Sequence, residues 1–195
     1  KERFVKMLEF GTAGLRGILG VGTNRMNIYT VALATQGMAD YVKEKFENPS
    51  VAIAYDSRIK SDLFANVTAR VFAANGVKAY LFKELMPTPT LSFAFVSALQ
   101  RRHVITASHN PSKYNGYKAY GEDGCQLNPQ AAAKVLELAS KTDIFDGVKK
   151  ISLEEGLRTG MIEYISDDLV DEYLDRVFAL RVSKAPVEKS DLKVV

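Results

Sequence analysis

The chain has 195 residues, of which 47% are hydrophobic, which is enough to bury one core and leaves little for a second domain. Its 26 basic and 23 acidic side chains give a net charge of +3, and neither sign forms a block of the kind that binds nucleic acid. The apolar runs fall far short of the roughly 20 residues that span a bilayer, and the first residues do not resemble a signal peptide, so neither a membrane nor a nucleic acid is an expected partner.

The two ends of the sequence read as interrupted elements. Residues 1–9 predict the last turns of a helix, and residues 192–195 begin a strand-like run. We therefore expect this sequence to be a piece of a longer polypeptide.

The first half of the chain predicts a helix, a strand and a second helix. Asn27 is a typical helix cap, and apolar residues recur at spacings of three and four from there to about Phe46. Val51 to Tyr55 is a continuous apolar run of strand length. A second helix begins at Ser61 and ends at Asn75-Gly76. Its expected inward residues are Leu63, Phe64, Val67, Val71 and Phe72.

Further strands and helices alternate along the middle of the chain. Val77 to Phe82 and His103 to Ala107 are predicted strands, and Thr90 to Leu99 is a predicted helix with proline at its entrance. Asn115-Gly116 is a dipeptide that tolerates the positive φ of hairpin turns, so Tyr117 to Tyr120 is expected to return antiparallel.

Two more helices are predicted, at Asn128 to Ser140 and at Asp167 to Leu180. Because strands and helices alternate and one strand reverses, the sequence predicts an α/β fold, a three-layer α/β/α sandwich around a mixed sheet.

Ser108 is the first candidate for chemistry. It follows a predicted strand, and functional groups in such sheets collect in the loops beyond the strand carboxyl ends. Pro111 pushes Asn110 into extended geometry, and the resulting stiff turn suits a side chain that is presented to solvent. The simpler alternative is a serine whose hydroxyl satisfies a turn amide.

Nucleophilic hydrolysis fits the sequence poorly. Ser108 does not lie in a G-x-S-x-G motif, and side chains of adjacent residues on an extended chain point to opposite sides, so His109 is not an expected base for it. His103 reads as structural. The single cysteine, Cys125, cannot form an internal disulfide, which fits a cytoplasmic location.

A glycine-rich stretch, Phe10 to Gly17, is the second candidate, because glycines let backbone amides approach an anion and Arg16 can grip phosphate oxygens with two donors. Arg16, Lys113, Lys118 and His109 are thus cations that could surround the Ser108 hydroxyl. A phosphate would explain such a gathering. Arg58 is expected to steady a loop by pairing with a carboxylate.

Four stretches carry a resemblance to a known family. The TASHNP sequence of Thr106 to Pro111 resembles the phosphoserine loop of the α-D-phosphohexomutases. FGTAGLRG at Phe10 to Gly17 resembles the amino-terminal segment of that family that contacts phosphate. Tyr55 to Arg58 resembles the loop after an early strand, and Asn115 to Lys118 the segment that ends in a substrate-contacting lysine. The stretches FGTAGLRG, GTNRMN, TQG and YNGYKAYGEDG are most similar to the bacterial α-phosphoglucomutase branch, close to its phosphopentomutase-like members.

The resemblance implies reversible phosphoryl transfer that interconverts glucose 1-phosphate and glucose 6-phosphate through glucose 1,6-bisphosphate. Ser108 would carry the phosphoryl group, and its phosphate would give one ligand to Mg²⁺. Thr12, Arg16 and Lys118 would bind phosphate and sugar hydroxyls. His109 would either assist proton transfer or only shape the loop. Phosphomannomutases and phosphopentomutases of the same family remain alternatives.

The resemblance also implies that other parts of the machinery lie outside this sequence. The D-G-D-x-D-R loop with the remaining metal carboxylates and the G-E-x-S-G loop that reads the sugar do not occur. We therefore expect residues 1–182 to be the first of four domains, carrying the phosphoserine loop, and residues 183–195 to be a linker and the start of the second. The piece alone is expected to be inactive, with a phosphosugar and the other domains of its own chain as partners. A noncatalytic anion-binding module is the alternative from another class.

Overall fold

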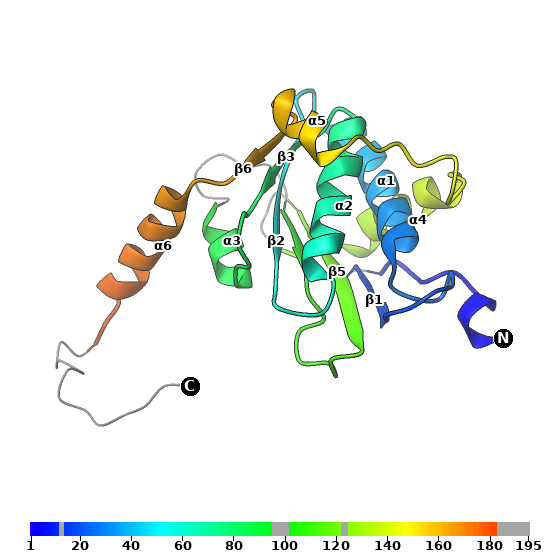
Figure 1. Cartoon of the computed structure of the whole chain (residues 1–195), viewed down its shortest axis with the longest axis horizontal. Coiled ribbons are helices and arrows are strands. Elements are labelled where there is room, and N and C mark those ends of the chain that lie inside the picture. The colour runs from blue at the N-terminus through cyan, green and yellow to red at the C-terminus, as the bar shows by residue number, and fades with distance from the viewer. Residues whose placement is uncertain (12–13, 95–101, 122–124, 183–195) are drawn as a thin grey trace. The chain divides into compact units, whose positions relative to one another are not determined.

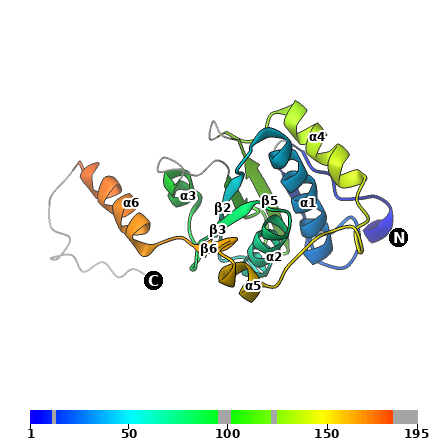
Figure 2. The same ribbon diagram turned by 90° about the horizontal axis from the view of Figure 1, so that it is seen from above.

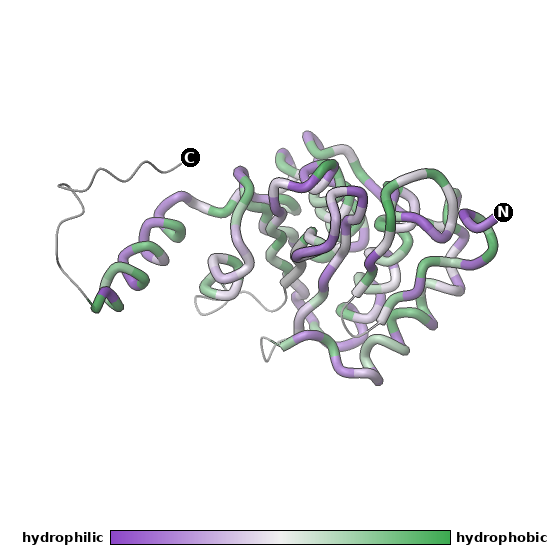
Figure 3. Tube along the Cα trace, turned by 90° about the horizontal axis from the view of Figure 1, so that it is seen from below, coloured by the Kyte–Doolittle hydropathy of each residue, from purple (hydrophilic) through white to green (hydrophobic). Residues whose placement is uncertain are grey.

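The computed structural model describes residues 1–11, 14–94, 102–121 and 125–182, and the chain divides into two compact units, Lys1–Ile165 and Ser166–Val195 (Figure 1). The second unit has one described helix, α6 (Asp167–Ala179), where a helix was predicted. Ser166 caps α6, because its hydroxyl accepts the amide N–H of Asp168 at 3.1 Å. Along α6, hydrophilic and hydrophobic residues alternate in short stretches (Figure 3).

The first unit is built on a six-stranded sheet with the order β1-β5-β4-β2-β3-β6. The strands are β1 (Leu15–Ile18), β2 (Ser50–Tyr55), β3 (Lys78–Leu81), β4 (Arg102–Ile105), β5 (Tyr114–Tyr120) and β6 (Ile162–Tyr164). β5 is antiparallel to both of its neighbours, whereas β4, β2, β3 and β6 pair in parallel. The sheet is therefore mixed, as predicted.

Helices cover both faces of this sheet (Figures 1 and 2). α1 (Ile28–Lys45), α2 (Ser61–Ala74) and α4 (Pro129–Ser140) lie on one face, with α4 packed against α1. α3 (Thr88–Ala94) lies on the other face, against β2 and β4, and the short α5 (Leu153–Arg158) packs against α2 and β6. This is the predicted three-layer α/β/α arrangement.

Local signals explain where the main helices begin. The Asn27 side chain accepts the amide N–H groups of Tyr29 and Thr30, and the Thr30 hydroxyl accepts the N–H of Asn27, which completes a capping box for α1. Asn128 caps α4 in the same way, by accepting the N–H of Ala131 at 2.8 Å. The core lies between the sheet and these helices and includes the fully buried Val51, Ile53, Phe64, Phe72 and Tyr117.

The structure corrects three expectations about the ends and faces of helices. Residues 1–9 contain only a short 3-10 helix, Glu2–Phe4, and no α-helical turns. α3 begins at Thr88, two residues before the predicted start, because proline fits the first turn of a helix; the predicted second half, from residue 95, lies outside the described residues. Leu63 of α2 is 41% exposed and does not face the core as predicted.

The Asn115-Gly116 dipeptide is not a turn. Both residues lie inside β5, which pairs with β1 on one side and β4 on the other. Glycine is required there by close approach of the backbone: a Cβ on Gly116 would lie 2.6 Å from the carbonyl oxygen of Thr106 and 3.0 Å from that of Leu15. The antiparallel direction of Tyr117–Tyr120 was predicted correctly, but for the wrong reason.

Three short elements were not predicted, namely β1, α5 and β6, which have four, six and three residues. Segments of this length offer too few positions for a hydrophobic period to appear. β1 and β6 form because a neighbouring strand supplies their hydrogen bonds. Within the described residues, no helix is long and apolar enough to cross a membrane.

Candidate active site

Ser108 lies in the loop that follows β4, and its side chain is exposed. Its backbone is left-handed, with φ of 57°, and it is one of two non-glycine residues with positive φ in the described part of the chain. For a residue with a Cβ this conformation costs roughly 1–2 kcal/mol. The turn amide is satisfied by a neighbour, because the Thr106 hydroxyl accepts the N–H of Ser108 at 2.9 Å. The Ser108 hydroxyl itself has His109 Nδ1 as its recorded neighbour among the described residues, and no turn amide is recorded as donating to it.

His109 lies closer to Ser108 than the sequence argument allowed. Its Nδ1 atom is 3.3 Å from Ser108 Oγ. The expectation that adjacent side chains point to opposite sides holds only for an extended chain, and the positive φ of Ser108 removes that condition. His109 is thus within hydrogen-bond reach of the hydroxyl and can exchange a proton with it.

Arg58, in the loop after β2, binds the backbone of residues 106–114, which we call the serine loop. Its Nη2 atom donates to the carbonyl oxygens of Ser108 and Asn110, the latter at 2.7 Å. Its Nη1 atom donates to those of Pro111 and Tyr114 at 3.3 and 3.2 Å. The expected pairing of Arg58 with a carboxylate is present too, but its reach across the serine loop was not predicted.

Asp56, Ser61 and Asn115 form a hydrogen-bond network that contacts Arg58. The Asp56 carboxylate lies 3.5 Å from Arg58 Nε and accepts the backbone N–H of Arg58 at 3.0 Å and the hydroxyl of Ser61 at 2.7 Å. The Ser61 hydroxyl in turn accepts the side-chain N–H of Asn115 at 3.0 Å. Asn115 is fully buried in β5. This network connects the start of α2 and β5 to the loop that carries Arg58, and sequence reasoning missed it; the Asp-Ser-Arg triplet directly after a buried strand was the available signal.

Arg16 and Lys118 lie on one face of the sheet. Arg16 in β1 is opposite Gly116 in β5, and Lys118 follows two residues later on the same side. Arg16 Nη1 donates to the side-chain oxygen of Asn110 at 3.2 Å, which brings the guanidinium to the serine loop. Partial burial, and next the Arg16 charge, lower the pKa of the Lys118 ammonium, while Asp56 acts in the opposite direction. An anion bound between these cations would relieve their repulsion.

The other predicted contacts to phosphate are placed differently. The Lys113 ammonium lies 5.9 Å from the centre of the Tyr114 ring, which is its recorded contact. Thr12 lies outside the described residues. Gly14, two residues further along, has φ of 81°, and a Cβ there would lie 1.8 Å from the carbonyl oxygen of Tyr117, so glycine is required for this segment to press against β5.

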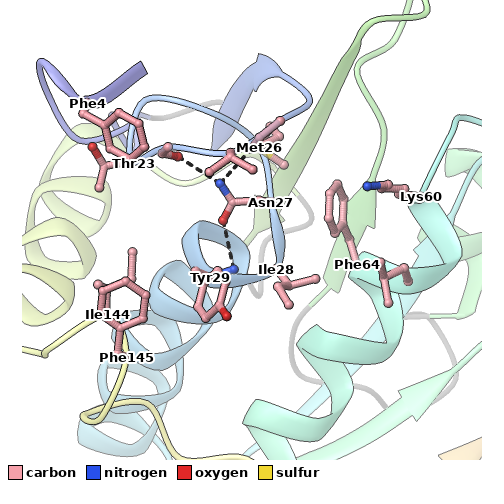
Figure 4. A pocket seen from close by; sticks show the side chains of 14 residues that line it. Phe4, Thr23, Met26, Asn27, Ile28, Tyr29, Lys60, Phe64, Ile144 and Phe145 are labelled. Atoms are coloured by element: carbon pink, nitrogen blue, oxygen red, sulfur yellow. Dashed lines mark hydrogen bonds between the residues drawn. The ribbon is translucent and has the colours of Figure 1, made fainter. Parts of the chain in front are cut away.

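An open pocket of about 470 Å³ lies beside the serine loop and is lined by residues of both loops: Asp56, Ser57, Arg58, Ile59, Ser108, Asn110 and Ser112. A second pocket, of about 420 Å³, shares no lining residue with it. Figure 4 shows its apolar walls, among them Phe4, Phe64 and Phe145, and its central polar residue, Asn27, which is engaged in capping α1 and in bonds to the carbonyls of Gly20 and Gly22. Of the site residues described above, Asp56, Arg58, Ser108 and Asn110 line the first pocket, whereas Arg16, His109 and Lys118 are not among its lining residues.

A complete magnesium site is not formed by the described residues, among which no group of three or more His, Cys, Asp or Glu side chains could hold a metal ion. Asp56 lines the pocket beside Ser108, but its carboxylate already accepts hydrogen bonds from Arg58 and Ser61. Since Mg²⁺ prefers an octahedron of oxygen ligands, these residues alone do not fit it.

Comparison with known proteins identifies the family. Residues 7–144 match the family model described as Phosphoglucomutase/phosphomannomutase, alpha/beta/alpha domain I. The chain belongs to this family. The phosphoglucomutase of Staphylococcus haemolyticus is 38% identical over 201 residues, which cover 100% of this chain and 35% of that protein. The phosphoglucomutase of Staphylococcus saprophyticus is 36% identical over 194 residues, covering 98% and 34%.

A solved structure supports the fold of this phosphoglucomutase/phosphomannomutase domain. The family protein from Burkholderia thailandensis superposes with a TM-score of 0.69 at 19% identity, over 91% of this chain and 36% of that one. The chain thus spans 34–35% of the length of the curated relatives described above.

Proposed function

We propose that this chain is the amino-terminal domain of a phosphoglucomutase, in which Ser108 carries the phosphoryl group exchanged between glucose 1-phosphate and glucose 6-phosphate. The observation that supports this most directly is an exposed serine held in left-handed backbone, on a loop whose Asn110 binds Arg16. The name of the two relatives supports the choice of glucose over mannose or a pentose. Residues 1–182 form the catalytic first domain in this proposal, which is inactive without the rest of the chain.

The chemistry runs in two half-reactions. In the first, the bond between phosphorus and Ser108 Oγ breaks and a bond to a sugar hydroxyl oxygen forms; the proton of that hydroxyl passes to a base, and the departing Ser108 Oγ takes up a proton from His109 Nδ1. In the second, Ser108 Oγ attacks the other phosphoryl group of the bisphosphorylated sugar and its proton passes to His109 Nδ1, which lies 3.3 Å away. The bond between that phosphorus and the sugar oxygen breaks, and the sugar oxygen takes up the proton that the base gained in the first half-reaction. Arg16 and Lys118 bind phosphoryl oxygens and balance their charge, which is the main contribution a protein makes to phosphoryl transfer.

Mg²⁺ and glucose 1,6-bisphosphate belong to the same proposal. A divalent cation on the phosphate of Ser108 neutralises negative charge there when it is bound. Ser108 is the single metal-binding position that we assign in this sequence, and the carboxylates that complete the site belong to parts of the polypeptide outside it.

The contact between Ser108 and His109 also favours a second candidate, a serine hydrolase. Such enzymes need a third group that orients the histidine, and in the part of the chain that the structure describes no carboxylate is hydrogen-bonded to His109. A fluorophosphonate probe separates the two candidates, because it labels an activated serine nucleophile; we expect no labelling of Ser108.

Phosphoryl loading is the direct test of the proposal. The full-length protein is incubated with glucose 1,6-bisphosphate, and its mass is expected to increase by one phosphoryl group, which peptide mapping assigns to Ser108. Ser57 and Ser112, which line the same pocket, are matched internal controls and stay unmodified. Binding of the sugar without any loading would favour a noncatalytic anion-binding module. Loading from mannose 1,6-bisphosphate at a higher kcat/KM would favour a phosphomannomutase.

Phosphate affinity should depend on pH through Lys118. Since burial and Arg16 lower the pKa of its ammonium below the ordinary 10.5, this charge is lost earlier than that of an exposed lysine as pH rises. Binding of inorganic phosphate to the full-length protein is therefore expected to weaken between neutral pH and 10.5, with proton uptake on binding, whereas Lys118→Arg keeps its affinity. Calorimetric titrations at successive pH values measure the phosphate affinity and the proton uptake of the unchanged protein and of Lys118→Arg. A parallel decline in the two proteins would show that Lys118 is not a phosphate ligand.

A further inference from the structure

Two arginines reach the serine loop, and the structure gives them different surroundings. Arg16 is exposed, and its recorded hydrogen bond uses one donor, to the side chain of Asn110. The Arg58 side chain is only 15% exposed, and its guanidinium donates to four carbonyl oxygens of the serine loop and lies against Asp56. A guanidinium has five N–H donors and no acceptor. Arg58 therefore has its donors occupied by the protein, whereas within the described residues Arg16 keeps donors available for a ligand.

The four carbonyls that Arg58 binds belong to residues 108, 110, 111 and 114, so one planar group fixes most of the loop between β4 and β5. The Ser108 carbonyl is among them, and its orientation depends on the left-handed backbone of that residue. Because this conformation is unfavourable for a serine, it persists only where surrounding contacts determine it. Arg58 and the Thr106 hydroxyl supply those contacts.

We propose that Arg58 is a positioning residue of the phosphoryl-transfer site: it keeps Ser108 in its left-handed, exposed conformation next to His109, and it does not bind the phosphoryl group. The inference rests on the proposed function of Ser108. A lysine cannot replace Arg58 in this role, since a single ammonium presents its three donors from one point and cannot span carbonyls along seven residues of loop.

The test compares Arg58→Lys with the unchanged full-length protein in the conversion of glucose 1-phosphate to glucose 6-phosphate. Misplacing a reacting group by about 1 Å costs roughly 10²-fold in rate, so kcat should fall by that order while KM for glucose 1-phosphate stays within about threefold. The rate at which glucose 1,6-bisphosphate loads Ser108 should fall in proportion. A rise in KM at unchanged kcat would identify Arg58 as a substrate ligand and overturn the inference, as would normal values of both.

Arg70→Lys is the matched control. Arg70 also donates its guanidinium to a backbone carbonyl, that of Ile151 at 2.7 Å, but neither residue lines the pocket beside Ser108. We expect the kcat of Arg70→Lys to be unchanged, although its melting temperature falls by about as much as that of Arg58→Lys. If both variants lost kcat equally, the effect at Arg58 would be a general loss of stability and the inference would be wrong.

Asp56→Asn serves as a milder second variant in case Arg58→Lys folds poorly. The amide still accepts the Ser61 hydroxyl but loses the charge that faces Arg58 Nε at 3.5 Å. A smaller fall in kcat, again at constant KM, is expected, and no fall would contradict the inference. The proposed role of Ser108 as phosphoryl carrier is tested separately. If Ser108→Ala is inactive while Arg58→Lys and Asp56→Asn keep the kcat of the unchanged protein, only the role of Arg58 is wrong.

Discussion

Replacing Ser108 with alanine in the full-length protein is expected to lower kcat for the interconversion of glucose 1-phosphate and glucose 6-phosphate by roughly 10⁴-fold or more, the order of loss seen when a covalent nucleophile is removed. The mechanism has no other carrier in this loop, since Ser112 is not followed by a histidine and lies beyond the stiff Asn110-Pro111 turn. A coupled assay for glucose 6-phosphate measures the loss. Activity within tenfold of the unchanged protein would reject Ser108 as the carrier.

Ser108→Gly distinguishes lost chemistry from a lost fold. Glycine adopts positive φ without strain, whereas alanine keeps the Cβ that makes φ of 57° unfavourable. After subtraction of the larger chain entropy of glycine in the unfolded state, Ser108→Gly should be about 0.5–1 kcal/mol more stable than Ser108→Ala. Both variants should be equally inactive. Denaturant unfolding measures the difference; a less stable Ser108→Gly would mean that the left-handed backbone is not retained in solution.

Arg16→Ala is expected to lower kcat/KM by about 10²–10³-fold, the cost of removing one preorganised donor from the site of developing charge. Arg16→Lys should recover only part of this loss, because it restores the charge but not the planar pair of donors that matches a phosphate. Steady-state kinetics of the full-length variants measure both effects. A loss smaller than tenfold in Arg16→Ala would place the phosphate elsewhere.

Lys113→Ala is the matched control for Arg16→Ala, since it also removes one positive charge beside the serine loop. The recorded contact of Lys113 is the ring of Tyr114, and we therefore expect kcat/KM to change by less than about threefold, the effect of one screened surface charge. If Lys113→Ala and Arg16→Ala were equally impaired, a diffuse positive field would explain the result better than a specific phosphate contact.

The fold was predictable wherever local sequence signals were strong. The caps Asn27 and Asn128 begin α1 and α4, and the apolar run from Val51 corresponds to β2, because capping and hydrophobic period are properties of a few consecutive residues. β1 and β6 were not predictable in this way. Each is stabilised by pairing with a strand distant in the sequence, and no local pattern records that pairing.

For the site, the sequence identified Ser108, Arg16 and Lys118 as candidates but not their geometry. Their roles in phosphoryl transfer and that of Thr12, which lies outside the described residues, stay predictions. The proximity of His109 to the Ser108 hydroxyl depends on one dihedral angle, and sequence reasoning assumed an extended chain there. Tertiary contacts, including those of Arg58, set that angle.

By itself the sequence determined the α/β class, the order of the main helices and strands, and the family resemblance carried by residues 106–111, since each depends on residue types close together in the chain. The tertiary structure alone decided which side chains meet. Arg58 and Ser108 are 50 positions apart, and Arg16 and Asn110 are 94 apart. Such contacts exist only after the sheet has brought β1, β2, β4 and β5 side by side, because the order of strands in a sheet is fixed by packing of the whole core and not by any local stretch.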